Sequence, residues 1–335
     1  MRRPVTAATS SAGTMMALRA QHRGGARQLS YGHAPMPTPG IGDVLVAVHA
    51  ASFTPAELTW TSTWTDRLGR PRTPVIPGHE VSGVVVEVGY GTTGLDVGDA
   101  VFGLTDWYRD GAAATHAVIE ARNLAPKPAT LDHVHAACVP LAASTAWQAL
   151  FEHGRLRAGQ SVLVHGAAGG VGGFAVQLAS SVGAEVIATG RGANLAALGE
   201  LGADRVIDVK RQPFETVVGP VDLVVDVAGG DLARRSWPLV RSGGTLVTAV
   251  GGVPEGERRD DARWVFFVVE ADRSTLVELA RSVDAGELRP VVSAVFPLAQ
   301  GRQAFEAKLR GGMPGKVGLR VADNALDASY GVSSA

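Results

Sequence analysis

The sequence predicts an α/β protein with a doubly wound parallel sheet and a second, β-rich, barrel-like domain. Three observations support this prediction. The chain has 335 residues, and since domains usually hold roughly 100–200 residues, two domains are expected. Short strand-like runs separated by Gly and Pro fill the first part, whereas apolar runs alternate with helix-sized segments from about residue 141 onward. Hydrophobic residues make up 46% and charged residues 19% of the chain, a composition typical of well-packed domains.

The first part contains three strand-like segments. Residues 43–50 follow the Pro/Gly-rich stretch 35–42, and residues 81–88 follow Pro77-Gly78. Residues 97–103 have the glycine pattern of a tight turn that enters a strand. Short strands with frequent turn residues predict a compact barrel-like domain.

The second part alternates apolar strands with helical spacers, the pattern of a parallel, doubly wound sheet. The predicted strands are 161–165, 184–189, 205–208, 221–226, 244–250 and 291–296. The predicted helices include 174–182 and 276–284. A last strand at 316–321 is expected to rejoin the first domain.

The two ends of the chain are expected to lie outside the folded domains. Residues 1–15 are interpreted as a disordered leader, or as residues that precede a start at Met15 or Met16, because they have no apolar core for a signal peptide. Residues 323–335 are small and polar and predict a flexible tail. No run approaches the roughly 18 apolar residues that would predict a membrane span.

Cysteine content and net charge narrow the possible partners. Cys138 is the only cysteine, which excludes an internal disulfide and a Cys-rich zinc site and fits a cytoplasmic protein. The net charge of −1 provides no overall basic field for nucleic acid. We therefore expect a small-molecule substrate and neither nucleic acid nor membrane as a partner.

A glycine-rich turn, Gly166-Ala-Ala-Gly-Gly-Val-Gly172, lies between the strand at 161–165 and the following helix. In this position glycines allow a tight turn and close approach of a pyrophosphate to the unpaired N–H groups of the helix. The motif predicts a dinucleotide site with contacts at Ala168, Gly169, Gly170 and Val171. The alternative is a glycine-rich turn that binds no ligand.

The end of the second strand of this unit predicts which dinucleotide binds. NAD enzymes usually place an acidic residue there, which would accept hydrogen bonds from the ribose 2′-hydroxyl. This chain has Gly190-Arg191 instead, and a guanidinium can grip a 2′-phosphate. Gly190 and Arg191 therefore predict NADPH as the cofactor, unless Arg191 is only a solvated loop residue.

Several motifs in the same order resemble the medium-chain dehydrogenase/reductase family, specifically its zinc-independent, quinone-oxidoreductase-like branch. The segments that carry the resemblance are 77–83, 97–103, 145–150, 166–172, 201–204, 206–208 and 315–317. The resemblance implies a Rossmann domain at 141–285, inserted into a GroES-like β-barrel catalytic domain at 16–140 and 286–322. It also implies an active site between the two domains, and a homodimer.

The resemblance also implies where a catalytic zinc would bind in metal-dependent relatives. Here Thr54 occupies the position of a cysteine ligand, while His79 and Glu80 remain. The third position, near residues 141–144, offers neither Cys nor Asp. Since a catalytic zinc usually takes three protein ligands, we expect no metal.

Further cofactor contacts are assigned by resemblance and by position. Thr145 resembles the threonine that contacts the nicotinamide end, and residues 263–269 resemble a late Rossmann segment whose backbone touches the nicotinamide. For 263–269 an ordinary core strand is an equally good interpretation. The remaining predicted contacts are Val227, Ala249, Val250, Phe267, Val268 and Lys316.

The predicted catalytic residues are Thr54, Trp60 and His79. Thr54 could donate to a substrate carbonyl, although Thr54 and Glu57 replace an Asn and an Asp of the family pattern. Trp60, together with Trp64 and Trp107, could form an aromatic wall for a planar substrate, or each could be a packing residue. His116, His133 and His135 are, like His79, conceivable proton donors that no spacing distinguishes.

These features predict an NADPH-dependent, metal-free oxidoreductase that reduces quinones or the C=C bond of α,β-unsaturated carbonyl compounds. A tailoring enoyl reductase of secondary metabolism, dedicated to one intermediate, is a close variant. The alternative is a non-redox NADPH-binding protein that uses the same cleft as a lyase, a cyclase or a binding module.

Overall fold

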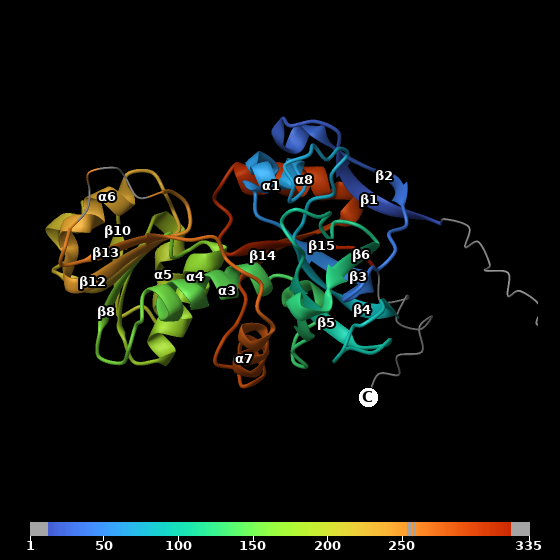
Figure 1. The fold of residues 1–335 in the computed structure, drawn as a ribbon. Helices are drawn as coiled ribbons and strands as arrows, with labels where there is room; N and C mark the ends of the chain where they lie inside the picture. Colours follow the sequence, from blue (N-terminus) through green and yellow to red (C-terminus); the bar gives the residue numbers. More distant parts are fainter. Residues whose placement is uncertain (1–12, 253–255, 257–258, 323–335) are drawn as a thin grey trace, which may run out of the picture.

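The computed structural model describes residues 13–252, 256 and 259–322. The chain forms two lobes that lie side by side, with α3 (Pro140–Trp147) and α7 (Arg273–Asp284) between them (Figure 1). Residues from both ends of the sequence build one lobe, and the middle of the sequence builds the other. This arrangement confirms the predicted fold class, a Rossmann-type parallel sheet with a GroES-like domain.

The lobe built from both ends of the sequence, called the catalytic lobe below, contains a seven-stranded sheet and a separate hairpin. The sheet order is β14-β15-β3-β4-β5-β7, and β6 also pairs with β3. The hairpin strands are β1 (Thr14–Ala20) and β2 (Leu29–Pro35). The sheet strands are β3 (Asp43–Ser52), β4 (Glu80–Val88), β5 (Ala100–Leu104), β6 (His116–Glu120), β7 (Leu124–Pro126), β14 (Val292–Pro297) and β15 (Lys316–Arg320). Every residue of β3 is buried, as expected for its almost continuous apolar run.

The second lobe contains a six-stranded, fully parallel sheet in the order β10-β9-β8-β11-β12-β13. This is the strand order of a dinucleotide-binding fold, in which the connections diverge from β8. Its strands are β8 (Ser161–His165), β9 (Glu185–Gly190), β10 (Arg205–Asp208), β11 (Val221–Asp226), β12 (Val240–Thr248) and β13 (Arg263–Phe266).

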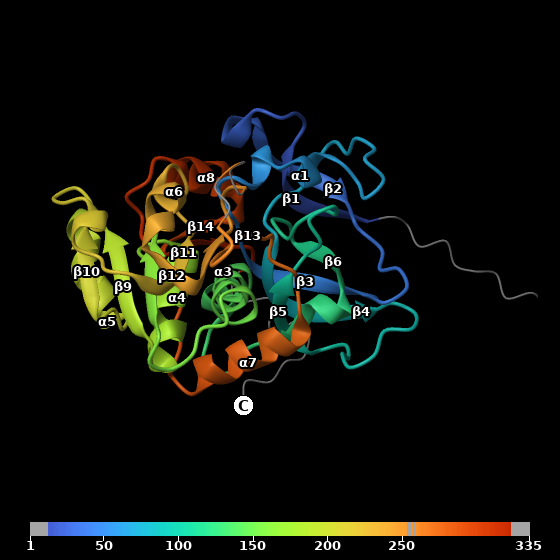
Figure 2. The same ribbon diagram turned by 60° about the vertical axis from the view of Figure 1, so that its left-hand side comes forward.

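Helices cover both faces of the parallel sheet and the outside of the catalytic lobe, and α7 runs beneath both lobes in Figure 2. Besides α3 and α7 they are α1 (Thr61–Trp64), α2 (His133–Ala136), α4 (Gly170–Ser181), α5 (Leu195–Glu200), α6 (Leu232–Ser236) and α8 (Gly301–Leu309). None of the helices in the described part of the chain is long and apolar enough to span a bilayer.

Most predicted elements are confirmed, and two helices begin earlier than predicted. The helix predicted at 174–182 starts at Gly170, because Gly169 caps it and accepts a hydrogen bond from Gly173 at 3.0 Å. The helix predicted at 276–284 starts at Arg273, because the Asp272 carboxylate accepts from the Thr275 N–H at 2.8 Å. The last strand does rejoin the first lobe, where β15 pairs with β3.

The predicted boundary of the leader was wrong by two residues. Thr14 and Met15 belong to β1, where they pair with Pro35 and Ala34 of β2. Met15 is 6% exposed and packs into the core of the catalytic lobe, so burial of its apolar side chain fixes it there. Gly13 is exposed and precedes β1, whereas residues 1–12 of the predicted leader and the predicted tail (323–335) lie outside the described residues.

Two glutamine side chains fasten the segments that connect the lobes. Gln148 exchanges two hydrogen bonds with the backbone of Glu270, at 2.9 and 3.1 Å. Gln177 of α4 does the same with the backbone of Arg289, at 3.1 and 3.0 Å, where the chain returns to the catalytic lobe. Each amide satisfies a backbone N–H and a backbone carbonyl of these connecting segments.

Candidate active site

The predicted cofactor residues gather at one edge of the parallel sheet. Strands β8, β9, β11 and β12 end at His165, Gly190, Asp226 and Thr248. Because the strands are parallel neighbours, the segments that follow them leave from the same edge, where ligands of such sheets bind. The sheet thus brings together the glycine turn and the residues that follow these strands, namely Ala168, Gly169, Gly170, Val171, Arg191, Val227, Ala249 and Val250.

The glycine turn requires glycine for two different reasons. Gly166 has φ = 74°, a backbone conformation that other residues rarely adopt. A Cβ on Gly172 would lie 2.2 Å from the Gly166 carbonyl oxygen, so no side chain fits there. No side chain caps α4, and its first N–H groups face the turn without intrahelical partners. Turn and helix start form the kind of cradle that a pyrophosphate occupies.

The catalytic lobe contacts this turn directly. Gly315 donates its N–H to the Ala168 carbonyl at 2.8 Å, and the stem of Lys316 fills the space where a Cβ of Gly170 would lie. The Lys316 ammonium is buried, donates to the Phe53 carbonyl at 3.0 Å and forms an ion pair with Glu80. Lys316 therefore connects the glycine turn to the catalytic lobe, and its predicted contact with a cofactor remains a prediction.

The end of β9 leaves its arginine unengaged. Gly190 is buried, and a Cβ on it would lie 2.9 Å from the Leu198 side chain. Arg191 is exposed, and β9 itself has no acidic residue after Glu185 at its start. Lys210, a second exposed cation, follows the end of the neighbouring strand β10. Asp208, which ends β10 and pairs with Gly190, places a carboxylate beside these cations, so the corner carries charges of both signs.

The remaining predicted cofactor residues differ in their exposure and in the contacts that their side chains already make. Val250 and Val268 are exposed at 48% and 61% of their surfaces, whereas Phe267 is 7% exposed and packs its ring on His153 at 4.6 Å. Thr145 is buried, and its hydroxyl already donates to the Leu141 carbonyl at 2.6 Å within α3. Cofactor contacts of Thr145 and Phe267 remain predictions, and those of Phe267 would have to use its backbone.

A buried histidine beneath the glycine turn was missed by the sequence analysis. His165 ends β8, with Nδ1 at 2.9 Å from the Thr189 hydroxyl and Nε2 at 2.7 Å from the Ser236 hydroxyl. Burial lowers the pKa of this imidazole to about 4, so it is neutral near pH 7. It bonds β8 to β9 and α6 beneath the cofactor edge. In the sequence, the only feature that could have indicated His165 was its position as a polar residue at the end of an apolar strand.

On the catalytic side, Glu57 organises the loop that contains Thr54. The Glu57 side chain is fully buried and accepts hydrogen bonds from Gly78 N–H at 2.6 Å and Thr54 N–H at 3.2 Å. Burial raises its pKa to about 7, against the two backbone donors and the nearby Lys316 cation. Glu57 thereby holds Thr54 next to the segment that carries His79.

His79 follows Gly78, which donates to Glu57, and its side chain is enclosed in the same region of the catalytic lobe. Its side chain is 1% exposed, and Nδ1 lies 2.6 Å from the Thr105 hydroxyl. Its Nε2 atom is buried and has no hydrogen-bond partner among the described residues. Burial, with a smaller contribution from the Arg72 cation and against the nearby Asp106, lowers the pKa of His79 to about 4. The imidazole is neutral near pH 7.

Two of the three predicted wall tryptophans contact each other at the boundary between the lobes. Trp107 packs edge-on against Trp60 (5.4 Å between ring centroids) and against His79 (5.0 Å). Its indole N–H donates to the Val269 carbonyl of the other lobe at 3.3 Å. Trp64 instead lies in the core, 6% exposed, and its indole N–H donates to the Leu58 carbonyl, so for Trp64 the alternative of a packing residue holds.

A cavity of about 440 Å³ lies between the lobes beside Trp107. Its walls come from residues 104–108 of the catalytic lobe and from residues 268–271 that follow β13, together with Arg67, Arg122 and Asn123. Of the predicted site residues, Val268 lines it directly and His79 is reached through Thr105 and Trp107. Neither Thr105 nor the Trp107–Val269 contact had a sequence signal, because both depend on how the lobes meet.

The residues at the positions of a catalytic zinc do not fit that ion. Thr54 has no side-chain carboxylate, imidazole or thiolate, and Leu141 is apolar. The Glu80 carboxylate already binds Lys316 and accepts the Leu141 N–H at 3.1 Å. Within the described ranges, no group of three His, Cys, Asp or Glu side chains is arranged to hold a metal. Among the residues at these zinc positions, His79 is the remaining side chain of a type that binds zinc.

The other histidines considered as proton donors lie elsewhere. His133 contacts the Ser82 hydroxyl at 2.7 Å and packs its ring at a tilt against His49, and His135 pairs with Asp132 at the start of α2. His116 lies beside Thr115 on β6. None of these three lines the cavity between the lobes, so the structure does not bring them to the candidate site.

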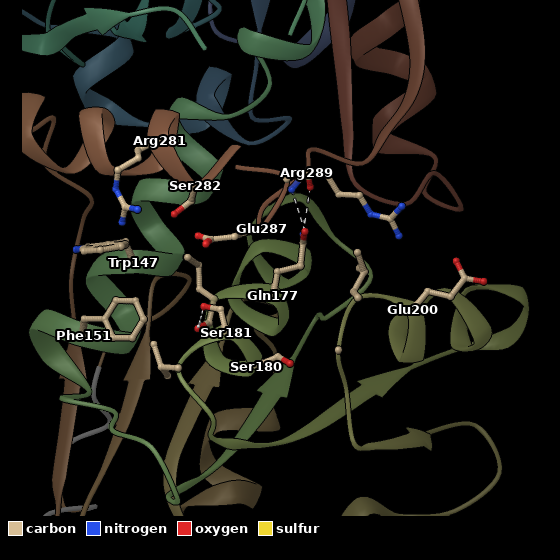
Figure 3. A pocket seen from close by; sticks show the side chains of 15 residues that line it. Trp147, Phe151, Gln177, Ser180, Ser181, Glu200, Arg281, Ser282, Glu287 and Arg289 are labelled. Atoms are coloured by element: carbon tan, nitrogen blue, oxygen red, sulfur yellow. Dashed lines mark hydrogen bonds between the residues drawn. The ribbon is translucent and has the colours of Figure 1, made fainter. Parts of the chain in front are cut away.

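A larger hollow, about 790 Å³, lies away from this site. Figure 3 shows Trp147 and Phe151 on one side of it and Gln177 and Arg289 on the other. It opens at the C-terminal half of α4, whereas the glycine turn adjoins the N-terminus of the same helix. Size alone would therefore point to the wrong end of the cofactor helix.

Family models match both lobes. The alcohol dehydrogenase GroES-like domain matches residues 40–129, and the zinc-binding dehydrogenase domain matches residues 201–318. The second match covers the later Rossmann strands and β15 but does not depend on the three metal positions described above, which lie before residue 201.

Relatives with assigned names have related activities. The chain is 33% identical to a 2-methylene-furan-3-one reductase of Solanum lycopersicum over 290 residues, covering 82% of this chain and 70% of that protein. It is 32% identical to a chloroplastic NADPH-dependent alkenal/one oxidoreductase of Arabidopsis thaliana over 273 residues, covering 78% and 68%. Among solved structures, a quinone oxidoreductase from Coxiella burnetii superposes with a TM-score of 0.86 at 27% identity, covering 92% of this chain and 100% of that one.

Proposed function

Because the chain belongs to the medium-chain dehydrogenase/reductase family and is a nicotinamide-dependent oxidoreductase of its quinone-reductase-like branch, we propose that it reduces quinones or α,β-unsaturated carbonyl compounds with NADPH and without a metal. One observation carries this proposal. At the corner where metal-dependent relatives would hold zinc, His79 stands alone, since Glu80 is engaged by Lys316 and Leu141.

The chemistry of the substrate follows from that corner. Oxidising an alcohol requires stabilisation of an alkoxide, for which a zinc Lewis acid is the usual means. Adding a hydride to a conjugated C=C bond or a quinone produces an enolate or a phenolate, which hydrogen-bond donors can stabilise. The cavity between the lobes, with an indole on its wall, suits a planar substrate of this kind.

The preference for NADPH rests on Arg191 and Lys210, two exposed cations at the ends of β9 and β10, against the carboxylate of Asp208 at the end of β10. Arg191 is exposed there, and Lys210 stands on the adjoining strand end. A 2′-phosphate bound at this corner gains charge-assisted hydrogen bonds, which a 2′-hydroxyl does not. When bound, the cofactor supplies the hydride, and the glycine turn with the N-terminus of α4 would hold its pyrophosphate.

A homodimer and a cytoplasmic location complete the proposal. Strand β13 is the last strand of the described sheet and pairs only with β12, so its outer edge is open. Phe266, the last residue of this strand, is 45% exposed. Exposed apolar side chains on an open strand edge favour pairing with a second copy. The cytoplasmic location rests on the single cysteine, Cys138, which is a buried thiol.

Stopped-flow loss of NADPH absorbance tests the reductase proposal. The panel comprises 1,4-benzoquinone, menadione, 3-penten-2-one and a bulky enoyl thioester, with and without EDTA. We expect turnover with at least one acceptor and no effect of EDTA. Turnover confined to the thioester would favour a dedicated tailoring enoyl reductase. Saturable NADPH binding without turnover on any acceptor would refute the reductase proposal and favour a non-redox NADPH-binding protein, and inhibition by EDTA would refute its metal-free part.

A further inference from the structure

His79 presents a nitrogen atom that the folded chain leaves unpaired. Its Nε2 atom is buried and has no hydrogen-bond partner in the part of the chain that the structure describes. An unsatisfied buried polar atom is destabilising, and such atoms in native proteins have a specific cause. At the boundary between the lobes, the cause that fits is a ligand atom that pairs with Nε2 when substrate binds.

The position of the proton on His79 is linked to the direction of its hydrogen bond with Thr105. The two residues are joined twice, because Thr105 N–H donates to the His79 carbonyl at 2.9 Å and the Thr105 hydroxyl lies 2.6 Å from Nδ1. Nδ1 is the hydrogen-bond partner of the Thr105 hydroxyl among the described residues, and either atom of this pair can donate. When the hydroxyl donates to Nδ1, a neutral imidazole carries its proton on Nε2.

We propose that Thr105 fixes His79 as the Nε2–H tautomer and that this N–H donates a hydrogen bond to the carbonyl oxygen of the substrate. The inference rests on the proposed reductase function and assigns two roles within it. His79 is a catalytic residue, because it touches the oxygen on which charge develops. Thr105 is a positioning residue, because it acts through His79.

The reaction balances without proton loss from His79. The β-carbon of the enone accepts a hydride from the dihydronicotinamide, which is oxidised by two electrons. The π electrons of the C=C bond move toward the carbonyl, and the resulting enolate oxygen accepts the Nε2–H hydrogen bond. The α-carbon then takes a proton from water, which gives the saturated ketone. A neutral, buried donor suits this role because its pairing costs little reorganisation in the transition state.

The surroundings of His79 show what must move for substrate to reach Nε2. Trp107 is in ring contact with His79 and also lines the cavity between the lobes, so it is the side chain that a bound substrate would displace. Asp106 and Thr105 line the same cavity. The charged groups that act on His79 are Arg72, which lowers its pKa, and Asp106, which raises it by less.

Nitrogen-15 NMR of the full-length protein labelled in histidine tests the tautomer independently of activity. The expected spectrum shows a neutral His79 with its proton on Nε2, identified by its loss in His79→Phe. Thr105→Val should redistribute the proton to Nδ1, and Thr105→Ser, which restores the hydroxyl, should return it to Nε2. A wild-type His79 protonated on Nδ1 would overturn the inference.

Kinetics test the role of the donor. Removing one preorganised donor lowers kcat by about 100- to 1,000-fold in a well-studied enzyme, so we expect His79→Phe to lose about that much and Thr105→Val about 10- to 100-fold. Thr105→Ser should recover most of kcat, and the Kd for NADPH should stay unchanged in all three variants. Thr115→Val is the matched control, because Thr115 contacts His116 in the same way at 3.2 Å but outside the cleft.

The two proposals can fail separately. If the wild-type protein turns over an enone and Thr105→Val keeps its kcat, the inference is wrong while the reductase function stands. If the wild-type protein turns over none of the acceptors, the proposed function fails, and cyclohexanone then tests the donor directly. A shift of the His79 Nε2–H resonance on saturation with cyclohexanone and NADP⁺ would support donation to a carbonyl, and an unchanged resonance would refute it.

Discussion

The Lys316 ammonium and the Glu80 carboxylate form a buried ion pair at the junction of the two lobes, with side chains 7% and 0% exposed. Each charge has a second partner, the Phe53 carbonyl for Lys316 and the Leu141 N–H for Glu80. The stem of Lys316 also packs against Gly170 of the glycine turn. The ion pair thus joins the loop before Thr54 and the cofactor helix, through Lys316, to the start of α3, through Glu80.

Replacing Lys316 should be strongly destabilising, because Glu80 would remain charged and buried without its cation. Breaking such a pair from one side costs about 3–5 kcal/mol, and we expect Lys316→Met to lose that much in urea unfolding. The double variant Lys316→Met/Glu80→Gln should lose less than Lys316→Met alone. The control is Arg281→Met, whose exposed pair with Glu278 should contribute less than about 1 kcal/mol. A Lys316→Met protein as stable as the wild type would contradict the prediction.

Arg191 should discriminate between the two nicotinamide dinucleotides. A charge-assisted contact with phosphate contributes about 1.5–3 kcal/mol, so Arg191→Ala should raise the Kd for NADPH about 10- to 100-fold and leave the Kd for NADH nearly unchanged. Isothermal titration calorimetry with both dinucleotides measures this. Arg205→Ala is the control, because Arg205 lies at the start of β10, at the end of the parallel strands that is opposite to Arg191. Equal losses for both dinucleotides would exclude Arg191 as the selector.

Gly172 and Gly199 should respond in opposite ways to the same substitution. A Cβ on Gly172 would lie 2.2 Å from the Gly166 carbonyl oxygen, so Gly172→Ala must distort the turn and should abolish NADPH binding. Gly199 is an exposed helical glycine of α5 with open space around it, and Gly199→Ala should stabilise the protein by about 0.5–1 kcal/mol. Thermal unfolding with and without NADPH measures both effects. Tight NADPH binding by Gly172→Ala would contradict the role assigned to the turn.

The sequence predicted the Rossmann strands well because buried parallel strands are apolar runs with clear ends. Strands β8, β10 and β11 have the predicted bounds, and the glycine turn follows β8 as expected. Helix starts were less predictable. Glycines have low helix propensity, which hid the first turn of α4, and the cap at Asp272 that extends α7 is a single residue.

The catalytic wall was only partly predictable. His79 and Thr54 came from a resemblance, and Trp107 was one of three tryptophans of which Trp64 proved to be a core residue. The contacts of Trp107 with Val269 and of Thr105 with His79 join residues 162 and 26 positions apart, respectively. Such pairings depend on how the lobes and strands meet, which no local pattern in one sequence encodes.

Buried titratable groups should make the stability of the protein depend on pH. Burial lowers the pKa of His79 and His165 to about 4 and that of His133 to about 3, from an ordinary value of 6.5. The unfolded chain therefore takes up protons first, and stability is lost as the pH falls from about 6.5 toward 4. Glu57 acts in the opposite direction, because its pKa is raised from 4.5 to about 7 and stability falls as the pH rises across that interval.

His133 provides the cleanest test because it lies outside the candidate site. Burial, together with the nearby His49 and Lys127 and against Asp132, keeps it neutral in the folded protein. One such group contributes a slope of about 1.4 kcal/mol per pH unit, so His133→Gln should flatten the dependence of unfolding free energy on pH by that amount between about pH 6 and 4. Loss of its contact with Ser82 would lower the whole curve without changing the slope. Urea unfolding at half-unit pH steps measures the slope, with the exposed His135→Gln as the control for the substitution itself. An unchanged slope in His133→Gln would show that this imidazole is protonated as readily in the folded protein as in the unfolded chain.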